Sequence, residues 1–179
     1  MLHVAILRSP IAHGRLRGLD PTAARAIPGV CAFITAAEIG TVPRIPLGLL
    51  PLPRTERFLQ PVIVADSVRY VGEPIAVVLA DSAALAEDGV GAIALDIEEL
   101  PPIADRRASG QHDILLFEES GTNLAVNFTA TAGDAEAAFR DADYVRRERF
   151  QVQRYTVLPI ECVSAWKIDP CRGVVGVQL

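Results

Sequence analysis

The sequence has little lysine and no cluster of basic residues. Lys167 is the only lysine among 17 basic residues, and the arginines occur singly or in pairs such as Arg106-Arg107. With 22 acidic residues the formal net charge is −5. A protein that binds nucleic acid needs basic side chains gathered on one face or along one helix. The composition therefore argues against a nucleic-acid partner.

Cysteine is also scarce. Cys31, Cys162 and Cys171 are widely spaced and form no Cys-x-x-Cys pair, and the three histidines lie far from them in the sequence. A structural zinc site needs about four clustered ligands, and a small secreted domain stabilised by disulfides needs an even, regular set of cysteines. We therefore predict neither a metal site nor a disulfide framework.

Long apolar runs are absent. No stretch approaches the roughly 18 residues of a membrane helix, and Leu2–Leu7 is too short for the core of a signal peptide. Half of the residues are nevertheless hydrophobic and 22% are charged, which is typical of a chain that buries a core. We expect a soluble, cytoplasmic protein without a membrane partner.

The first hundred residues predict short strands alternating with short helices. Asp20-Pro21 is expected to open a helix over 23–27, and Asp81-Ser82 to cap another that starts at Ala83. A helical turn is expected at 36–39, and the proline-rich segment 42–60 reads as an irregular loop whose apolar residues favour packing on a partner surface. Strands are expected at 2–7, 15–19, 30–35, 62–64, 68–71, 75–80 and 93–97.

The remaining residues indicate a polar connection followed by mainly β structure. Residues 104–121 are polar except for an apolar patch at 114–117. Asp134 is expected to cap a short helix over 135–139, and the alternation over 143–155 is typical of a long exposed strand. Two strands, 163–168 and 174–179, flank turn residues and predict a hairpin.

Six segments, in order along the chain, resemble those of the large, molybdopterin-binding subunits of xanthine dehydrogenase, aldehyde oxidase and carbon monoxide dehydrogenase. None of these motifs is specific alone, but their order and spacing extend over nearly the whole chain. They are the segment Leu7-Arg8-Ser9-Pro10-Ile11-Ala12-His13-Gly14-Arg15-Leu16; Pro28-Gly29-Val30; Val68-Arg69-Tyr70-Val71-Gly72-Glu73-Pro74-Ile75-Ala76-Val77-Val78; Ala86-Glu87-Asp88 with Asp96-Ile97-Glu98-Glu99-Leu100-Pro101; Gly121-Thr122-Asn123 with Gly133-Asp134; and Gln153-Arg154-Tyr155-Thr156 with Pro159-Ile160-Glu161.

The resemblance implies an α/β (α+β) fold class in two parts. Residues 1–105 are expected to form an α/β hammerhead domain, 106–120 a linker, and 121–179 the N-terminal part of a molybdopterin-binding domain. The family hydroxylates aldehydes, purines or related substrates with water as the oxygen source, or oxidises CO. Its electrons leave through iron–sulfur clusters and commonly FAD on partner domains or subunits.

The resemblance assigns no catalytic residue to this sequence. The family's glycine-rich pterin loops and its catalytic glutamate have no match here, so molybdopterin is not expected to bind this chain alone. Arg154, Tyr155 and Glu161 are the nearest candidates for supporting the metal pocket. Tyr155 stands where many relatives have His or Gln, and Arg154 and Glu161 read equally well as an ordinary pair at a strand end.

Other polar residues have plain structural interpretations. Gly72-Glu73-Pro74 is interpreted as a tight turn, and His13 as a turn or surface residue. Asp96 and Glu98 lie two apart on one strand face and are expected to face solvent. Asp141 and Asp143, among Arg140, Arg146 and Arg147, are interpreted as a solvated charged face.

Two functional hypotheses follow. In the first, the chain is an inert scaffolding part of a molybdenum hydroxylase, partnered by the rest of the molybdenum-binding subunit and by iron–sulfur and FAD subunits or domains, with a homodimer also considered. In the second, it is a free-standing binding or interaction module that reuses the hammerhead fold without enzyme activity.

Overall fold

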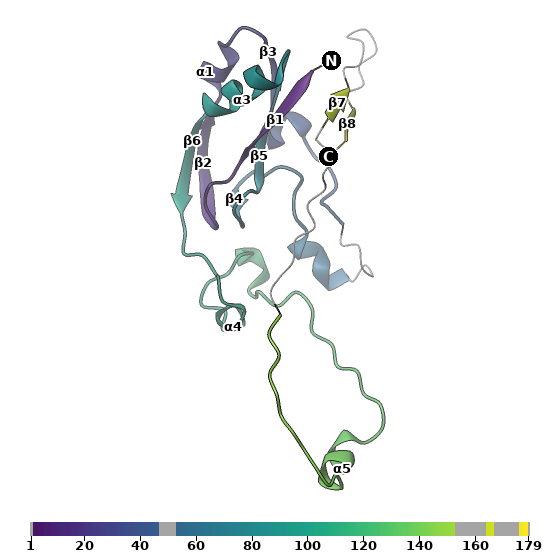
Figure 1. Cartoon of the computed structure of the whole chain (residues 1–179). Helices are drawn as coiled ribbons and strands as arrows, with labels where there is room; N and C mark the ends of the chain where they lie inside the picture. Colours follow the sequence, from purple (N-terminus) through teal and green to yellow (C-terminus); the bar gives the residue numbers. More distant parts are fainter. Residues whose placement is uncertain (1, 47–52, 153–163, 167–175, 179) are drawn as a thin grey trace. The chain divides into compact units, whose positions relative to one another are not determined.

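The computed structural model describes residues 2–46, 53–152, 164–166 and 176–178 (Figure 1). Contacts divide the chain into two compact units, residues 1–125 with 163–179, and residues 126–162. The first unit contains two three-stranded sheets and the helices packed on them. In the second, the described residues 126–152 contain one short helix.

The first sheet has strand order β1-β5-β3, and all its pairs are antiparallel. Its central strand is apolar almost throughout, as expected for a strand covered on both faces. Five of its seven residues are buried, and Val78 lies between Ala5 on one side and Phe33 on the other. The strands are β1 (His3–Arg8), β5 (Pro74–Ala80) and β3 (Val30–Ile34).

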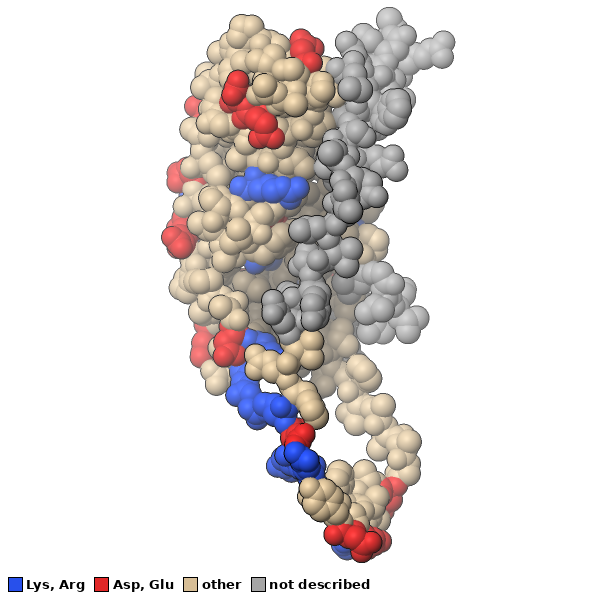
Figure 2. Space-filling view, viewed as in Figure 1, with Lys and Arg blue, Asp and Glu red and all other residues tan. Residues whose placement is uncertain are grey.

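The second sheet has strand order β4-β2-β6, again antiparallel. Asp96 and Glu98 are exposed on its edge strand, as predicted, and Glu98 forms an ion pair with Arg17 of the neighbouring strand. Figure 2 shows acidic side chains along this edge of the unit. Charged side chains on an edge strand oppose pairing with another chain. The strands are β4 (Ser67–Val68), β2 (Gly14–Asp20) and β6 (Ala94–Glu99).

The longest helix, α3 (Ala83–Gly91), begins at Ser82, whose Oγ accepts a hydrogen bond from the Leu85 N–H at 3.2 Å. It packs against β1 and β5, and its buried Gly89 lies against Val78. Two short helices, α1 (Thr22–Arg25) and α2 (Ala36–Ile39), flank β3. The Thr35 side chain and Glu38 form a capping box at the start of α2.

A separate apolar cluster joins the two sheets. Its buried members are Val64, Val68 and Ile75, and leucine and isoleucine side chains of β1, β2 and β6 pack around them. The two sheets therefore share part of their core, because apolar side chains of both pack in this cluster.

Three predictions about this unit are wrong in detail. Residues 62–64 form no strand, and 62 and 63 are bends, although Ile63 and Val64 are buried. The run of apolar residues therefore indicates burial correctly, but it does not indicate hydrogen bonding to a neighbouring strand. The strand predicted at 68–71 ends at Val68, because the chain turns there and Gly72 has φ +90°. Asp20 accepts hydrogen bonds from Thr22 but is not the N-cap residue of α1, which is Pro21.

In its described parts, residues 42–46 and 53–60, the predicted loop is irregular apart from a 3₁₀ helix, η1 (Pro53–Phe58). Ile45 is half exposed, whereas Thr55 is buried. The leucines at 47, 49, 50 and 52 lie outside the described residues, and their packing on a partner surface stays a prediction.

Residues 106–120, predicted as a linker, contain α4 (Arg106–Ser109) and η2 (Glu118–Ser120) and carry the buried Phe117. The predicted hairpin is present as an antiparallel pair, β7 (Ser164–Trp166) with β8 (Gly176–Gln178).

The unit 126–162 contains the helix α5 (Ala135–Arg140), whose start is capped by the Asp134 side chain as predicted. Residues 143–152 form no strand, because no described segment pairs with them. The predicted charged face is exposed as expected. Aromatic side chains of the unit 126–162 are exposed too, with Phe128 at 82% and Phe150 at 81%. No helix among the described residues is both long and apolar enough to cross a membrane.

Candidate functional site

The candidate residues from the sequence, Arg154, Tyr155 and Glu161, lie outside the described residues. The structure therefore brings none of them into a site, and their role stays a prediction. Two other places in the described chain carry polar groups close together.

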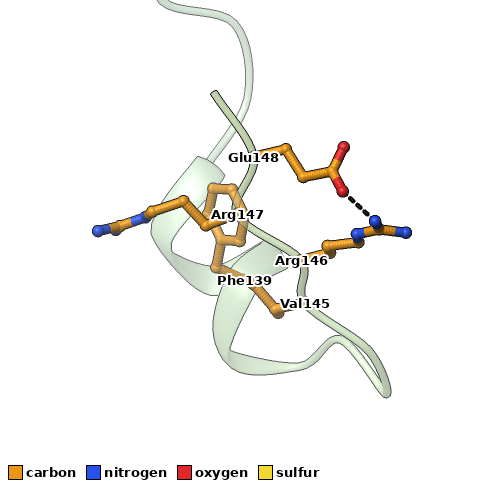
Figure 3. A pocket seen from close by; sticks show the side chains of 5 residues that line it. All are labelled: Phe139, Val145, Arg146, Arg147 and Glu148. Carbon is orange, nitrogen blue, oxygen red and sulfur yellow. Dashed lines mark ion pairs between the residues drawn. The ribbon is translucent and has the colours of Figure 1, made fainter. Parts of the chain in front are cut away.

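The first place is a surface hollow in the second unit, lined by Phe139, Val145, Arg146, Arg147 and Glu148 (Figure 3). Arg146 forms an ion pair with Glu148. The two arginine side chains extend in opposite directions from neighbouring positions, so they do not converge on one ligand. The Phe139 side chain is 67% exposed. The hollow is open to solvent and holds no group placed for catalysis.

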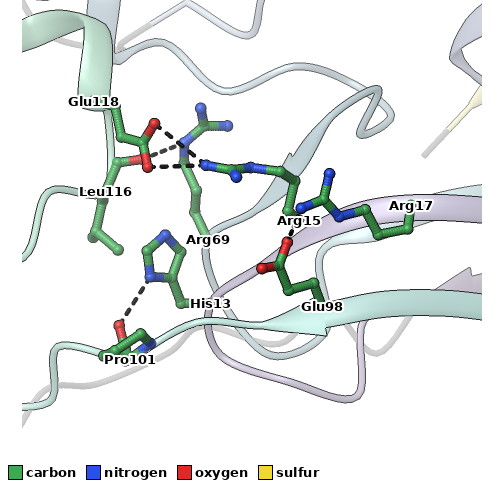
Figure 4. Close-up of polar contacts among 8 residues, drawn as sticks. All are labelled: His13, Arg15, Arg17, Arg69, Glu98, Pro101, Leu116 and Glu118. Atoms are coloured by element: carbon green, nitrogen blue, oxygen red, sulfur yellow. Dashed lines mark hydrogen bonds and ion pairs between the residues drawn. The ribbon is translucent and has the colours of Figure 1, made fainter.

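The second place is a polar cluster beside the second sheet, in the first unit (Figure 4). His13, predicted as a turn or surface residue, lies in the bend before β2 but is buried at 5% exposure. Its Nδ1 lies 2.9 Å from the carbonyl oxygen of Pro101, and the N–H of Leu100 donates to the His13 carbonyl at 3.0 Å. His13 thus fixes the chain that leaves β6. The surface interpretation is wrong because packing against residues nearly ninety positions away buries the ring.

Arg69 and Arg15 extend from the same region toward residues 116–118. The Nε of Arg69 donates to the Leu116 carbonyl at 2.8 Å, and Arg15 forms a 3.2 Å ion pair with Glu118. The Arg69 guanidinium carbon lies 4.3 Å from the centre of the Phe117 ring, within the range of a cation–π contact.

Glu73 is a buried carboxylate that sequence reasoning missed. The tight turn predicted at Gly72-Glu73-Pro74 is present, but the Glu73 side chain is only 1% exposed. Its Oε2 accepts the N–H of Arg69 at 2.5 Å, and its Oε1 is buried without a hydrogen-bond partner in the described structure. The motif Val-Gly-Glu-Pro gave no signal of this burial.

Burial raises the pKa of Glu73, and the hydrogen bond from Arg69 and the charge of that arginine oppose the rise only in part. The pKa of Tyr70 is also raised, first by burial and then by the nearby charge of Glu73. A carboxyl group with a raised pKa can act in proton transfer. Here, however, the Glu73 side chain is only 1% exposed, so its carboxyl group does not face solvent.

The open hollow of Figure 3 does not fit a metal or a pterin cofactor. No three His, Cys, Asp or Glu side chains among the described residues are arranged to hold a metal ion. A large anionic cofactor requires an enclosed pocket with converging donors, and the open hollow of Figure 3, with its diverging arginines, does not supply one. We therefore assign no chemical step to this chain.

Comparison with known proteins identifies the fold. Residues 1–101 match the family model described as the a/b hammerhead domain of aldehyde oxidase and xanthine dehydrogenase. The chain belongs to this family. The expected α/β hammerhead is confirmed by the match, and the two small antiparallel sheets with their helices agree with it.

Relatives extend the likeness along the chain. The nicotine 6-hydroxylase large subunit of Paenarthrobacter nicotinovorans is 33% identical over 99% of this hammerhead-family chain, and the carbon monoxide dehydrogenase large chain of Hydrogenophaga pseudoflava is 30% identical over 97%. The alignments cover 22% and 23% of those relatives. The chain thus spans about a fifth of their length.

A solved structure agrees with these relatives. The aldehyde oxidoreductase of Desulfovibrio gigas superposes with a TM-score of 0.60 at 30% identity, over 65% of this chain and 13% of the other. The same fold is therefore present in a much larger enzyme chain.

Proposed function

We propose that this chain supplies the hammerhead domain and the start of the molybdopterin-binding domain of a molybdenum hydroxylase large subunit. In this proposal, residues 1 to about 105 form the hammerhead domain, and 121–179 belong to the domain that follows. The role of the chain is scaffolding: it presents a folded surface on which the rest of the subunit assembles, and it contributes no catalytic residue.

The similarity of nearly the whole chain to large subunits of two such enzymes carries this proposal. Its support in the structure is the contrast between the two units. The first unit, residues 1–125 with 163–179, contains the family match and is named the hammerhead unit below; it has its own core of buried apolar residues. The unit 126–162 leaves large aromatic side chains exposed, including Phe128, Tyr144 and Phe150. Aromatic residues exposed together are typical of a surface that another part of a protein covers.

The cofactors of such an enzyme belong to other stretches of protein in this proposal. One relative is named a molybdenum-binding subunit of xanthine dehydrogenase, which supports molybdenum–pterin chemistry in the assembled enzyme. Iron–sulfur clusters and FAD would lie on partner domains or subunits, and the assembly would work in the cytoplasm. The reaction would be hydroxylation of an aldehyde, a purine or a related substrate, or oxidation of CO.

The decisive experiment is to purify the 179-residue chain and measure its molybdenum content and its reduction of an artificial dye. Aldehydes, purines and carbon monoxide serve as the three test substrates. We expect neither bound molybdenum nor turnover. Stoichiometric molybdenum together with dye reduction would overturn the scaffolding role.

The core of the hammerhead unit also favours a second candidate function, a free-standing interaction module without enzyme activity. Co-expression separates the two. The chain is produced with a polypeptide that covers the remaining four fifths of a large subunit, tagged for purification. Co-purification in a stable complex supports the scaffold, whereas failure to associate favours the module.

A further inference from the structure

Residues 102–125, which we name the strap, are folded upon themselves by one side chain. The Oδ1 of Asn123 accepts the N–H of Leu116 at 3.0 Å, and its Nδ2 donates to the carbonyls of Ser109 and Ile114 at 3.1 and 2.6 Å. A single asparagine thus connects three points of a loop of about fifteen residues. The left-handed backbone of Gly121, with φ +62°, returns the chain toward Asn123.

Arg69 connects this loop to the sheet. Besides its 2.8 Å hydrogen bond to the Leu116 carbonyl, the guanidinium lies over the ring of Phe117. Phe117 is 7% exposed, and its ring meets that of Phe58 edge-on with 5.4 Å between centres. Arginine can hold a carbonyl and an aromatic face at once, because its planar group donates in-plane while its face stacks.

Arg69 is itself held firmly. Its N–H donates to the buried Glu73 carboxylate, and its guanidinium donates to the Ser67 carbonyl at 3.2 Å. The second link from the strap to the sheet, Arg15 to Glu118, has side-chain exposures of 40% and 69%. Exposed ion pairs contribute little, so Arg69 is the dominant polar attachment.

We propose that the strap opens from the sheet and closes on it as one cooperative unit, with Arg69 as the clamp. Regions that open locally do so in contiguous segments with their own free energy, below that of global unfolding. Residues 126–152 follow the strap in the chain. The unit 126–162 is joined along the chain to the first unit at both ends, after residue 125 and before residue 163. Opening the strap would move the first of these attachment points from about residue 125 back to about residue 101.

Native-state hydrogen exchange on the full chain tests this proposal without relying on the proposed function. The probes are four of the strap amides with defined acceptors, those of Gln111, Leu116, Ser120 and Gly121, and the amides of β5 report on the core. In the native chain the strap amides are expected to share one opening free energy and one dependence on denaturant, lower than those of β5.

The Arg69→Met variant is expected to raise the exchange rates of all four strap amides together by about tenfold or more, because it removes a charged hydrogen bond and the ring contact. Arg69→Lys keeps the positive charge but loses the planar guanidinium with its several donors, so it should raise the exchange rates less. Arg106→Met changes an exposed arginine within the strap itself and is the matched control; it should leave the rates unchanged.

Two results would overturn the clamp. One is unchanged strap exchange in Arg69→Met while β5 stays protected; the other is a wide scatter of opening free energies among the strap amides of the native chain. If Arg69→Met also exposes β5, the native-chain measurement and Arg69→Lys decide the question, since neither requires that variant to fold.

Discussion

Glu73 places a carboxylate in the interior of the hammerhead unit, with one oxygen on the Arg69 N–H and the other without a partner in the described structure. Its pKa is raised above the ordinary value of 4.5, with burial as the largest cause. The folded chain therefore holds this proton more tightly than the unfolded chain does. By linkage, the contribution of Glu73 to stability is greatest at low pH and is lost as the pH rises from about 4.5 through the raised pKa.

The Glu73→Gln variant removes this titration and keeps nearly the same shape. We expect it to be more stable than the native chain at pH 7, because the amide carries no charge to desolvate, and to approach the native chain near pH 4. Urea unfolding at several pH values measures the difference. Glu99→Gln, which changes an exposed carboxyl of the same unit, is the control. A Glu73→Gln variant that is less stable at pH 7 would show that the Arg69 contacts outweigh burial.

For individual residues, the sequence predicted the local backbone but not which side chains are buried. The turn at Gly72-Glu73-Pro74 follows from local chemistry, since glycine readily adopts the positive φ that Gly72 shows. The burial of Glu73 and of His13 does not, because it results from contacts with Arg69, Ser9 and Pro101 that only the folded chain brings together. The pair of candidate residues Arg154 and Glu161, with Tyr155, stays a prediction.

Helix α3 provides a matched test of packing at the scale of one element. A Cβ on Gly89 would lie 2.8 Å from Val78 Cγ1 and 3.3 Å from Val30 Cγ2, whereas a Cβ on Gly91 would meet nothing within 4 Å. Val78 is fully buried and stiff, so it has little freedom to move away. Both substitutions by alanine gain helix propensity, about 1 kcal/mol.

We therefore expect opposite signs from the two variants. Gly89→Ala should lose about 1 kcal/mol net, because overpacking of about 1–3 kcal/mol exceeds the gain in propensity. Gly91→Ala should gain up to about 1 kcal/mol. Thermal and urea unfolding of the full chain give both values. If Gly89→Ala were as stabilising as Gly91→Ala, the close packing of α3 on β5 would be incorrect.

Helices and strands could be predicted where the local sequence pattern agrees with the tertiary packing. The continuous apolar run of β5 and the Ser82 cap of α3 identify both elements directly. The prediction failed at 62–64, where apolar side chains fill a core without a ladder, and at 143–152, where alternation exists but no described strand pairs with it. The hydrophobic pattern of a segment indicates its burial and its periodicity. Whether the segment pairs as a strand depends on a second strand, which the segment's own sequence does not reveal.

The two units differ in how far they bury their apolar side chains. In the hammerhead unit, apolar side chains gather in three clusters. In the unit 126–162, the residues with large exposed apolar side chains are Val126, Phe128, Phe139, Tyr144, Val145, Phe150 and Val152. The order of motifs along the chain was enough to predict the family and the hammerhead fold, because the first four motifs span residues 7–101, within the range that the family model matches. Which surfaces other parts of an enzyme cover was not predictable from those motifs.

Such exposed aromatic groups make self-association the expected behaviour of the purified chain, because association removes apolar surface from water. We expect its apparent mass in sedimentation to rise with concentration. The Phe128→Ser/Phe150→Ser double variant should weaken association by about tenfold or more, since it removes two side chains that are more than 80% exposed. Its hammerhead unfolding transition should not change.

Val42→Ser/Val71→Ser is the matched control, because it removes two exposed apolar side chains from the hammerhead unit instead, at 42% and 64% exposure. If both double variants weaken association equally, the surface involved is not confined to 126–152. If the native chain is a monomer at all accessible concentrations, the aromatic groups of this segment do not drive association in water. If only the Phe128→Ser/Phe150→Ser variant weakens association, the self-associating surface lies in residues 126–152, the segment that the proposed scaffold needs for docking.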